Sequence, residues 1–291
     1  MKKINLNCPG FYTGFNIYKT LLELQQTAPD CFNSNITIES IFDTFPNMIW
    51  NGGTINQGYQ PSLEKIKEII DFYYINNIEI ALTLTNPLLT KEDLYDRYCN
   101  KIVSLCENEN NSILVSSSIL EEYIRNKYPK FKIKRSIIAS NKNTDYLSLL
   151  NKYDKIVLPR RQIKDFKFLE SIPIEVRNRF ELLCNDPCPI ACPYLYKHYN
   201  GFAKITLYEE VTSKDILKCK TLKSDDPLKN FHYKNDQITY NEICEKYLPL
   251  SYNSFKLSGR NDVFTIIFSI VPFFFKQEYQ LELAHYLCYV I

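Results

Sequence analysis

The chain has 291 residues, of which 45% are hydrophobic and 23% are charged, which is an ordinary globular composition. Its formal net charge is only +2, and the lysines and arginines are interleaved with acidic residues, so the sequence carries no strong nucleic-acid signature. A chain of this length can bury a substantial core. We therefore expect one domain over residues 1–291.

The apolar segments are too short to cross a membrane. The N-terminus "MKKINLNCPGFYTGF" lacks the apolar stretch of a signal peptide. The most apolar run, "VFTIIFSIVPFFF" (Val263 to Phe275), contains Pro272 and predicts buried core rather than a bilayer span. We expect a cytoplasmic protein with no membrane partner, whose ten cysteines are buried side chains or metal ligands rather than disulfides.

Helical and β-rich segments alternate from about residue 60 onward. The segment "PSLEKIKEIIDFYYINN" has apolar residues at helical spacing, and "IEIALTLTN" then predicts a buried strand. Further strands are predicted at "SILVSSS", "FKIKRSIIAS", "KIVLPR" and "RFELLCN", preceded by "KINLNC" and "NMIWNGG" and followed by "FKLSGR". About eight parallel strands in this length favour a (β/α)8 TIM-like barrel, distorted and incomplete forms included, over an open doubly wound sheet. Residues 198–244 form the least regular segment, and we expect an insertion or lid there, before the last strand.

Polar residues and glycines follow the predicted strands, and in such a barrel the strand ends build the functional face. A glycine pair lets backbone N–H groups approach an anion closely, and an arginine can hold a carboxylate or phosphate through two hydrogen bonds. A simple turn and an ion pair with a glutamate would explain the same residues equally well, taken one by one. Arg260 is the candidate anion-binding residue, and the candidate substrate-binding residues are Trp50, Asn51, Gly52, Gly53, Asn86 and Asn185.

Three cysteines at C-x3-C-x3-C spacing follow the strand "RFELLCN". Thiolates spaced in this way in a loop can reach one metal centre, and sulfur ligands select zinc or an iron–sulfur cluster. Strand alternation turns Glu181 and Asn185 toward the barrel interior and Cys184 toward the helices. We therefore expect Cys188 and Cys192 to be ligands and Cys184 to be core. Later loops offer Cys219 and Cys244 as further ligands, with Cys8 as the competitor.

The other cysteines and the histidines give less support for a metal site or a catalytic site. Cys99 and Cys106 lie seven residues apart on one apolar helix face, so we expect both in the core. A cysteine hydrolase needs a histidine beside its thiolate, and His198 alone is close in sequence to the cysteine segment. No nucleophile motif surrounds any serine or cysteine. Peptidase chemistry has little support from the residues.

The stretch "ELLCNDPCPIACPYLYKHY", followed much later by "FKLSGR", resembles the collagenase-like peptidase family of unknown catalytic type. The match falls on Glu181, Cys188, Cys192 and, in the later motif, Lys256 and Gly259–Arg260. The family ending Cys-x-x-x-Cys-Arg is absent, because Pro193 follows Cys192, and Ser258 stands where the family has glutamate.

The resemblance implies a barrel and, from the family's oxygen-independent hydroxylases of ubiquinone precursors and RNA bases, a four-cysteine [4Fe–4S] cluster. The first hypothesis is therefore an iron–sulfur oxidoreductase or hydroxylase that acts on an anionic small molecule or a nucleobase, with Arg260, Glu181 and His198 as candidate catalytic residues and Cys188, Cys192, Cys219 and Cys244 as ligands. The alternatives are a metal-free barrel that serves as a binding or assembly protein, and a peptidase. The sequence leaves open whether the chain works alone or in a homo- or hetero-dimer.

Overall fold

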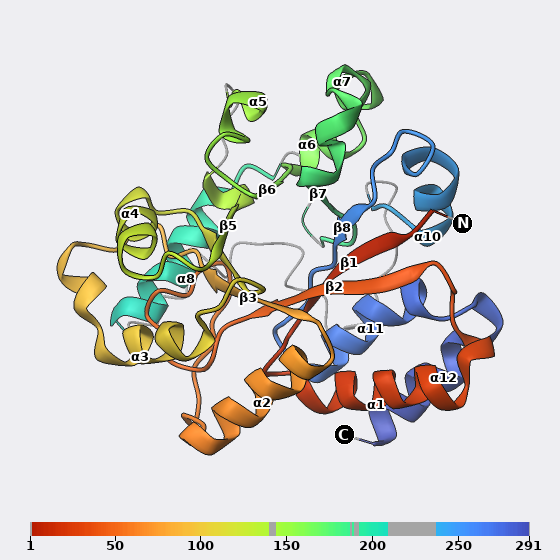
Figure 1. The fold of residues 1–291 in the computed structure, drawn as a ribbon, viewed down its shortest axis with the longest axis horizontal. Helices are drawn as coiled ribbons and strands as arrows, with labels where there is room; N and C mark the ends of the chain where they lie inside the picture. The colour runs from red at the N-terminus through yellow and green to blue at the C-terminus, as the bar shows by residue number, and fades with distance from the viewer. Residues whose placement is uncertain (1, 140–143, 187, 189–191, 209–236, 291) are drawn as a thin grey trace.

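The protein is described here by a computed structural model, in which residues 2–139, 144–186, 188, 192–208 and 237–290 are described. Eight parallel strands close into a barrel in the order of the sequence, with helices around the outside (Figure 1). This confirms the predicted (β/α)8 TIM-like architecture. The strands are β1 (Ile4–Pro9), β2 (Ile36–Asp43), β3 (Glu79–Leu84), β4 (Ser112–Val115), β5 (Lys132–Arg135), β6 (Lys155–Val157), β7 (Phe180–Leu183) and β8 (Ser254–Lys256).

Helices and short helical turns connect the strands. The longer helices are α1 (Phe15–Thr27), α2 (Leu63–Ile75), α3 (Arg97–Cys106), α4 (Ser118–Lys127), α8 (Leu195–Tyr208), α11 (Val263–Phe274) and α12 (Gln280–Tyr289). The shorter ones are α5 (Tyr146–Leu149), α6 (Arg160–Ile163), α7 (Phe166–Ser171), α10 (Tyr240–Glu242) and the π-helical turn η6 (Ile243–Tyr247). Short 3-10 helices are η1 (Pro29–Cys31), η2 (Glu92–Tyr95), η3 (Ile137–Ala139), η4 (Ile174–Arg179) and η7 (Gln277–Tyr279).

The predicted strand at "NMIWNGG" is wrong, and the second strand of the barrel is β2, earlier in the chain. Trp50 is fully buried, but it is buried in the loop that follows β2. Its indole N–H donates to the carbonyl of Asp93 at 2.8 Å, and its ring meets that of Tyr123 edge to face. An apolar run can therefore be buried beneath helices without pairing in the sheet. The strand β2 was missed because its alternation is broken by a bulge at its pairing with β1, around Glu39.

The apolar run near the C-terminus is the buried helix α11, as the core prediction required. Asp262 caps its start by accepting a hydrogen bond from the Thr265 backbone N–H, and the Thr265 hydroxyl accepts from the Asp262 N–H. This reciprocal cap satisfies two N–H groups that a helix start leaves free. Figure 1 shows α11 on the same side of the barrel as α1 and α12. In the described part of the chain, no helix has both the length and the apolar character that a membrane span needs.

All but the first three residues of helix α8 lie in the segment 198–244, which we expected to be an insertion. Its backbone carbonyls at Ala203 and Ile205 accept hydrogen bonds from Asn86 and Gln57, both at 3.4 Å. Asn86 follows β3, and Gln57 lies in the loop after β2, so α8 packs at the end of the barrel where the strands finish, hereafter the carboxyl end. Residues 209–236 of the expected lid lie outside the described residues.

Candidate active site in the barrel interior

Charged side chains point into the barrel interior in successive levels. The level nearest the start of the strands holds one ion pair. Lys155 on β6 contacts Glu39 on β2 at 2.5 Å and the hydroxyl of Ser254 on β8 at 3.0 Å. The Ser254 hydroxyl also lies 3.4 Å from Glu39. Each charge at this level therefore has an opposite charge beside it.

The next level is centred on Lys134 of β5, whose side chain is only 3% exposed. Its ammonium lies 2.7 Å from Oε1 of Glu79 on β3 and 3.3 Å from Oε1 of Glu181 on β7. Asn7 on β1 donates to the same Glu181 oxygen at 2.6 Å. Burial by itself lowers the pKa of the Lys134 ammonium, but the two carboxylates raise it overall, so Lys134 stays charged.

Glu181 points into the barrel, as strand alternation predicted, and its side chain is fully buried. Burial raises the pKa of its carboxyl, whereas Lys134, Lys256 and Lys155 lower it by a larger amount, so the group is ionised. Its second oxygen, Oε2, has no hydrogen-bond partner among the described residues. A buried, ionised oxygen without a donor is costly, which is unusual for a residue with only a structural role.

Lys256 of β8 faces the interior nearer the carboxyl end, level with Leu183 of β7. Its ammonium nitrogen lies 3.7 Å from the centroid of the Phe42 ring. Within the described part of the chain it has neither a hydrogen bond nor a carboxylate within ion-pair distance, and the residue keeps 8% of its surface exposed. Burial lowers the pKa of this amine to about 7, although Glu181 opposes the shift.

Arg260 ties the end of β8 to the neighbouring strand ends. Its guanidinium donates to the hydroxyl of Thr83, to Oδ1 of Asn51 at 3.1 Å and to the carbonyl of Gly52 at 2.8 Å. Asp43, at the end of β2, lies 3.6 Å away and is 1% exposed. Burial raises the pKa of Asp43, and Arg260 and hydrogen bonds from Thr13 and Thr44 oppose the rise. Arg260 therefore binds protein groups on several sides, which suits a residue that positions loops.

The predicted glycine pair is explained by backbone packing. A Cβ at Gly52 would lie 2.3 Å from the carbonyl oxygen of Thr85, because the two loops touch through their backbones. Gly53 has a φ of +80°, which side chains other than glycine rarely adopt. The Thr85 hydroxyl donates to the Gly52 carbonyl at 3.0 Å and so holds the same contact. The pair joins the ends of β2 and β3.

The other predicted substrate-binding residues are engaged with the protein. The Asn86 amide donates to the Ile49 and Ala203 carbonyls. The Asn185 amide donates to the Ser269 hydroxyl, and its oxygen accepts from the Ser258 N–H at 2.6 Å. These asparagines hold loops together at the carboxyl end.

His198 lies on α8 and is 5% exposed, with its ring stacked on that of Tyr194. Burial lowers its pKa. Its Nε2 has no hydrogen-bond partner among the described residues. Its environment is that of a neutral imidazole.

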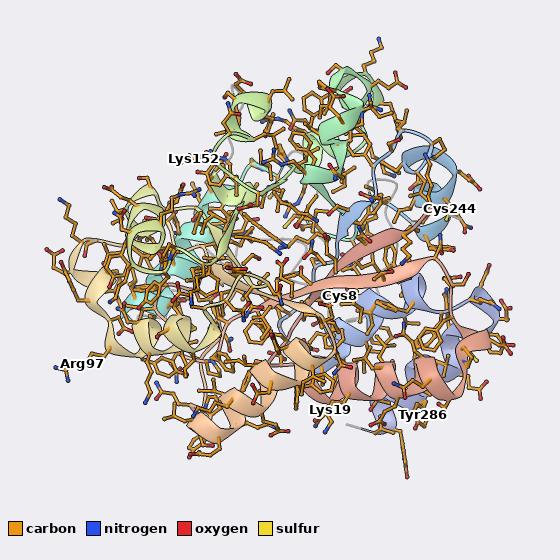
Figure 2. All side chains as sticks on the ribbon, in the orientation of Figure 1. Cys8, Lys19, Arg97, Lys152, Cys244 and Tyr286 are labelled. Carbon is orange, nitrogen blue, oxygen red and sulfur yellow. The ribbon has the colours of Figure 1, made fainter. Side chains whose placement is uncertain are left out.

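The cysteines do not gather at one point. Cys184 is buried against the helices with a raised thiol pKa, which confirms the prediction that it is core. Cys99 and Cys106 are fully buried, again as predicted. Cys8 is fully buried in the apolar layer, with its thiol pKa raised by burial, and Figure 2 shows it in the middle of the molecule.

Cys188 and Cys244 lie at different ends of the barrel. The Cys188 N–H donates to Asp186, just past the end of β7. Cys244 lies on η6 with its sulfur 3.9 Å from the amide nitrogen of Asn35, the residue that precedes β2 (Figure 2). The structure does not bring Cys244 to the cysteine segment, because the chain from residue 237 to β8 returns along the outside of the barrel.

The described residues do not supply the ligands of a four-cysteine cluster. Within them, no group of three His, Cys, Asp or Glu side chains is placed to hold a metal ion. Cys188 and Cys192 are half-buried at the carboxyl end, and Cys219 lies outside the described residues. Cys8 and Cys184 face the helices. The described part of the chain therefore provides two of the expected ligands and no more.

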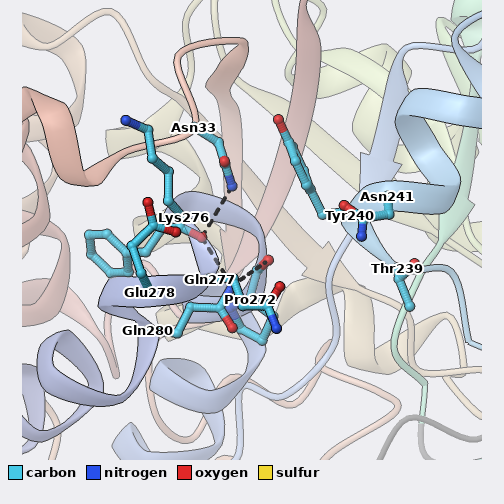
Figure 3. Close-up of a pocket in the computed structure, with 10 residues that line it drawn as sticks. Asn33, Thr239, Tyr240, Asn241, Pro272, Lys276, Gln277, Glu278 and Gln280 are labelled. Atoms are coloured by element: carbon cyan, nitrogen blue, oxygen red, sulfur yellow. Dashed lines mark hydrogen bonds between the residues drawn. The ribbon is translucent and has the colours of Figure 1, made fainter.

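A pocket of about 430 Å³ lies away from these residues (Figure 3). It is lined by Asn33, Tyr240 and Lys276 among others, near the end of α11. The Asn33 amide already donates to the Phe273 and Phe275 carbonyls, at 2.8 and 3.2 Å. None of the predicted site residues lines it.

Sequence reasoning did not select Lys134, Lys256 or Asp43 as site residues. For Lys256 a signal was present, since Lys256, Ser258 and Arg260 alternate along "FKLSGR" and share one face of the strand. The strand "FKIKRS" places Lys134 in the same way. Lysine is so often exposed that alternation alone did not separate an inward from an outward ammonium.

No protein-family model matches the chain, and no curated protein matches it in sequence. The solved structure of the U32 peptidase Mk0906 is similar over 89% of this chain and 93% of its own, with a TM-score of 0.47 and 11% sequence identity. U32 peptidases are the collagenase-like family whose motifs the sequence resembles. This identity is too low to carry any property of that protein over to the present chain.

Proposed function

We propose that the chain is an enzyme that binds a small anionic molecule at the carboxyl end of its barrel, with Lys256 as the cationic contact. The observation that carries the proposal is the placement of Lys256. Every other interior cation described above has a carboxylate beside it, at 2.5 Å for Lys155, 2.7 Å for Lys134 and 3.6 Å for Arg260. Lys256 is buried, and none of the described residues places a carboxylate within ion-pair distance of it.

A buried ammonium without a counterion is unfavourable, because it loses hydration and gains no opposite charge. The Phe42 ring compensates for part of this loss, at about 1 kcal/mol for a cation over an aromatic face. A bound anion would compensate for much more of it. Strand ends on the carboxyl side of a barrel are also where the loops converge on a ligand.

Binding of simple anions tests the proposal. We would measure the shift in melting temperature with inorganic phosphate, pyruvate and citrate for the wild-type chain and for Lys256→Met, Lys256→Arg and Lys101→Met. Lys101 is exposed on α3 and serves as the matched control. At least one of the three anions should stabilise the wild type, Lys101→Met and the charge-retaining Lys256→Arg, but not Lys256→Met. Absence of stabilisation by all three anions, or stabilisation that persists in Lys256→Met, would contradict the proposal.

An iron–sulfur enzyme with oxygen-independent redox or hydroxylation chemistry is the second candidate. It is favoured by the half-buried state of Cys188 and Cys192 at the carboxyl end and by the buried Arg160–Asp186 ion pair beside Cys188. A nearby guanidinium favours the thiolate form, which is the form that binds metal. The cluster would need Cys219 and one ligand beyond the cysteines placed above.

Iron and acid-labile sulfide content after anaerobic purification tests this candidate. Cys188→Ser should remove most of the iron, while Cys288→Ser, on the distant helix α12, should retain it. Equal iron content in the two variants, or no iron in the wild type after anaerobic reconstitution, would rule out a cluster at this segment.

A further inference from the structure

We infer that Lys256 is a nucleophilic amine that forms an imine with the carbonyl group of a small 2-oxo carboxylate. The inference rests on the proposed function, since it names the substrate class of the same site. The geometry that supports it is a buried lysine without a counterion, placed in one barrel interior with a carboxylate oxygen that has no hydrogen-bond partner in the described residues.

Nucleophilic attack requires an uncharged amine, and burial in an apolar site is a common way to obtain one. Lys256 meets this condition through its burial and the lack of a carboxylate within ion-pair distance in the described part of the chain, which together outweigh the contact of its nitrogen with the Phe42 ring. With its pKa lowered to about 7, roughly half of the amine is uncharged at neutral pH. The residue as a whole keeps 8% of its surface exposed.

The chemical step balances without an oxidant or reductant. The Nζ lone pair forms a bond to the carbonyl carbon, and the carbonyl π electrons move to its oxygen. That oxygen takes up one proton from the nitrogen to give the carbinolamine. It takes up the second nitrogen proton as the C–O bond breaks, so that it leaves as water and the C=N bond remains. Glu181 faces the same interior two residues before Leu183, the register partner of Lys256, and its Oε2 is an acceptor for the proton in transit.

The carboxylate of the substrate follows from the charges at the carboxyl end. Protonation of the imine restores a positive charge at the position of the Lys256 ammonium, and Arg260 adds a second cation at the same end of the barrel. Asp43 is the only acidic residue for which an ion pair with either cation is described. A carboxylate beside the imine would therefore lower the net positive charge of the site.

Reductive trapping tests the inference. The wild-type chain would be incubated with pyruvate and sodium borohydride at pH 7, and carboxyethyl groups located by mass spectrometry of its peptides. Lys256 should be modified more than about tenfold faster than the exposed Lys101, because burial lowers the pKa of the Lys256 amine to about 7. The preference should vanish in urea, where both lysines are solvated alike. Lys256→Arg should still be stabilised by pyruvate, but the fast modification should be lost, and only the slow modification of the remaining lysines should be seen in this variant.

The outcomes separate this inference from the proposed function. Stabilisation by pyruvate that depends on the charge at position 256, together with modification of Lys256 no faster than that of Lys101, would overturn the imine and leave the anion site intact. Stabilisation that does not depend on that charge would overturn both. A preference for Lys256 that persists in urea would show that local sequence, rather than the barrel interior, causes the reactivity, and would also overturn the inference.

Discussion

The barrel interior has a lower part, which holds Lys155 and Lys134, and an upper part nearer the carboxyl end, which holds Lys256. The two parts differ in whether each ammonium has a carboxylate partner, that is, whether its charge is matched. In the lower part, Lys155 and Lys134 each contact a carboxylate within 2.7 Å. In the upper part, Lys256 lies over an aromatic ring, with no carboxylate within ion-pair distance in the described residues. Matched charges hold the strands in register, whereas the unmatched ammonium lowers stability unless a ligand compensates it. The difference separates the structural half of the interior from the half that we assign to function.

The largest expected effect comes from breaking the matched half. Lys134→Met leaves the buried carboxylate of Glu181 and the 12% exposed carboxylate of Glu79 without their shared cation, and breaking a buried pair in this way costs about 3–5 kcal/mol. Urea denaturation would measure the loss. The same replacement at Lys256 removes no carboxylate partner and should not lower the free energy of unfolding at pH 7. Equal losses in the two variants would show that the two halves do not differ.

A second prediction concerns the backbone contact between the loops after β2 and β3, at the carboxyl end of the barrel. Gly52→Ala places a methyl group 2.3 Å from the Thr85 carbonyl oxygen, and a backbone atom cannot move aside without shifting its loop. Overpacking of this kind costs about 1–3 kcal/mol. A lower melting temperature would check it, with Lys256→Arg as a reference variant in the same region. Unchanged stability would mean that the loops after β2 and β3 are not in contact.

The pH dependence of stability sharpens the comparison further. The pKa of Lys256 is about 7 in the folded chain and about 10.5 when the lysine is solvated. Between these values the unfolded chain binds more protons, so stability rises with pH, by about 1–2 kcal/mol from pH 7 to 8.5. Lys256 faces Glu79, Glu181, Lys134 and Arg260. The directions of the pKa shifts of Glu181 and Lys134, and the pKa of about 10 of Arg260, keep these three groups charged in this window.

The measurement is the free energy of unfolding of the wild type and of Lys256→Met at several pH values from 7 to 8.5. The wild type should gain stability relative to the variant as the pH rises. Above that window, unfolded cysteines lose protons that the buried thiols retain, and stability falls for a different reason. Parallel curves for the two proteins would mean that the Lys256 amine is solvated.

The smallest effect is expected outside the barrel. Lys65 and Glu68 on α2 form an ion pair at 2.9 Å, but their side chains are 44% and 50% exposed. Such a pair contributes about 0–0.5 kcal/mol, so Lys65→Met should leave the denaturation midpoint almost unchanged. A loss of stability comparable to that of Lys134→Met would show that the interior ion pairs contribute no more to the free energy of unfolding than this exposed pair does.

Local patterns predicted much of the barrel correctly. Seven of the eight strands fall where short β-rich runs were expected, and the alternation along β7 correctly turned Glu181 inward and Cys184 outward. The failure at "NMIWNGG" has a physical cause, because the apolar run around Trp50 is buried by Tyr123 and the loop carrying Asp93 rather than by strand pairing. The apolar residues of a run predict that it is buried, but they do not show which other segment of the chain buries it.

The sequence by itself determined the (β/α) alternation, the parallel barrel and the inward or outward direction of residues within a strand, since each follows from contacts between near neighbours in the chain. Only the tertiary structure decided which charges meet. Lys134 joins Glu79 and Glu181 because closing the barrel sets the register of β3, β5 and β7 around one axis. The same closure places Cys244 and Cys188 at different ends and leaves Lys256 without a partner in the described interior, which no spacing along the chain could reveal.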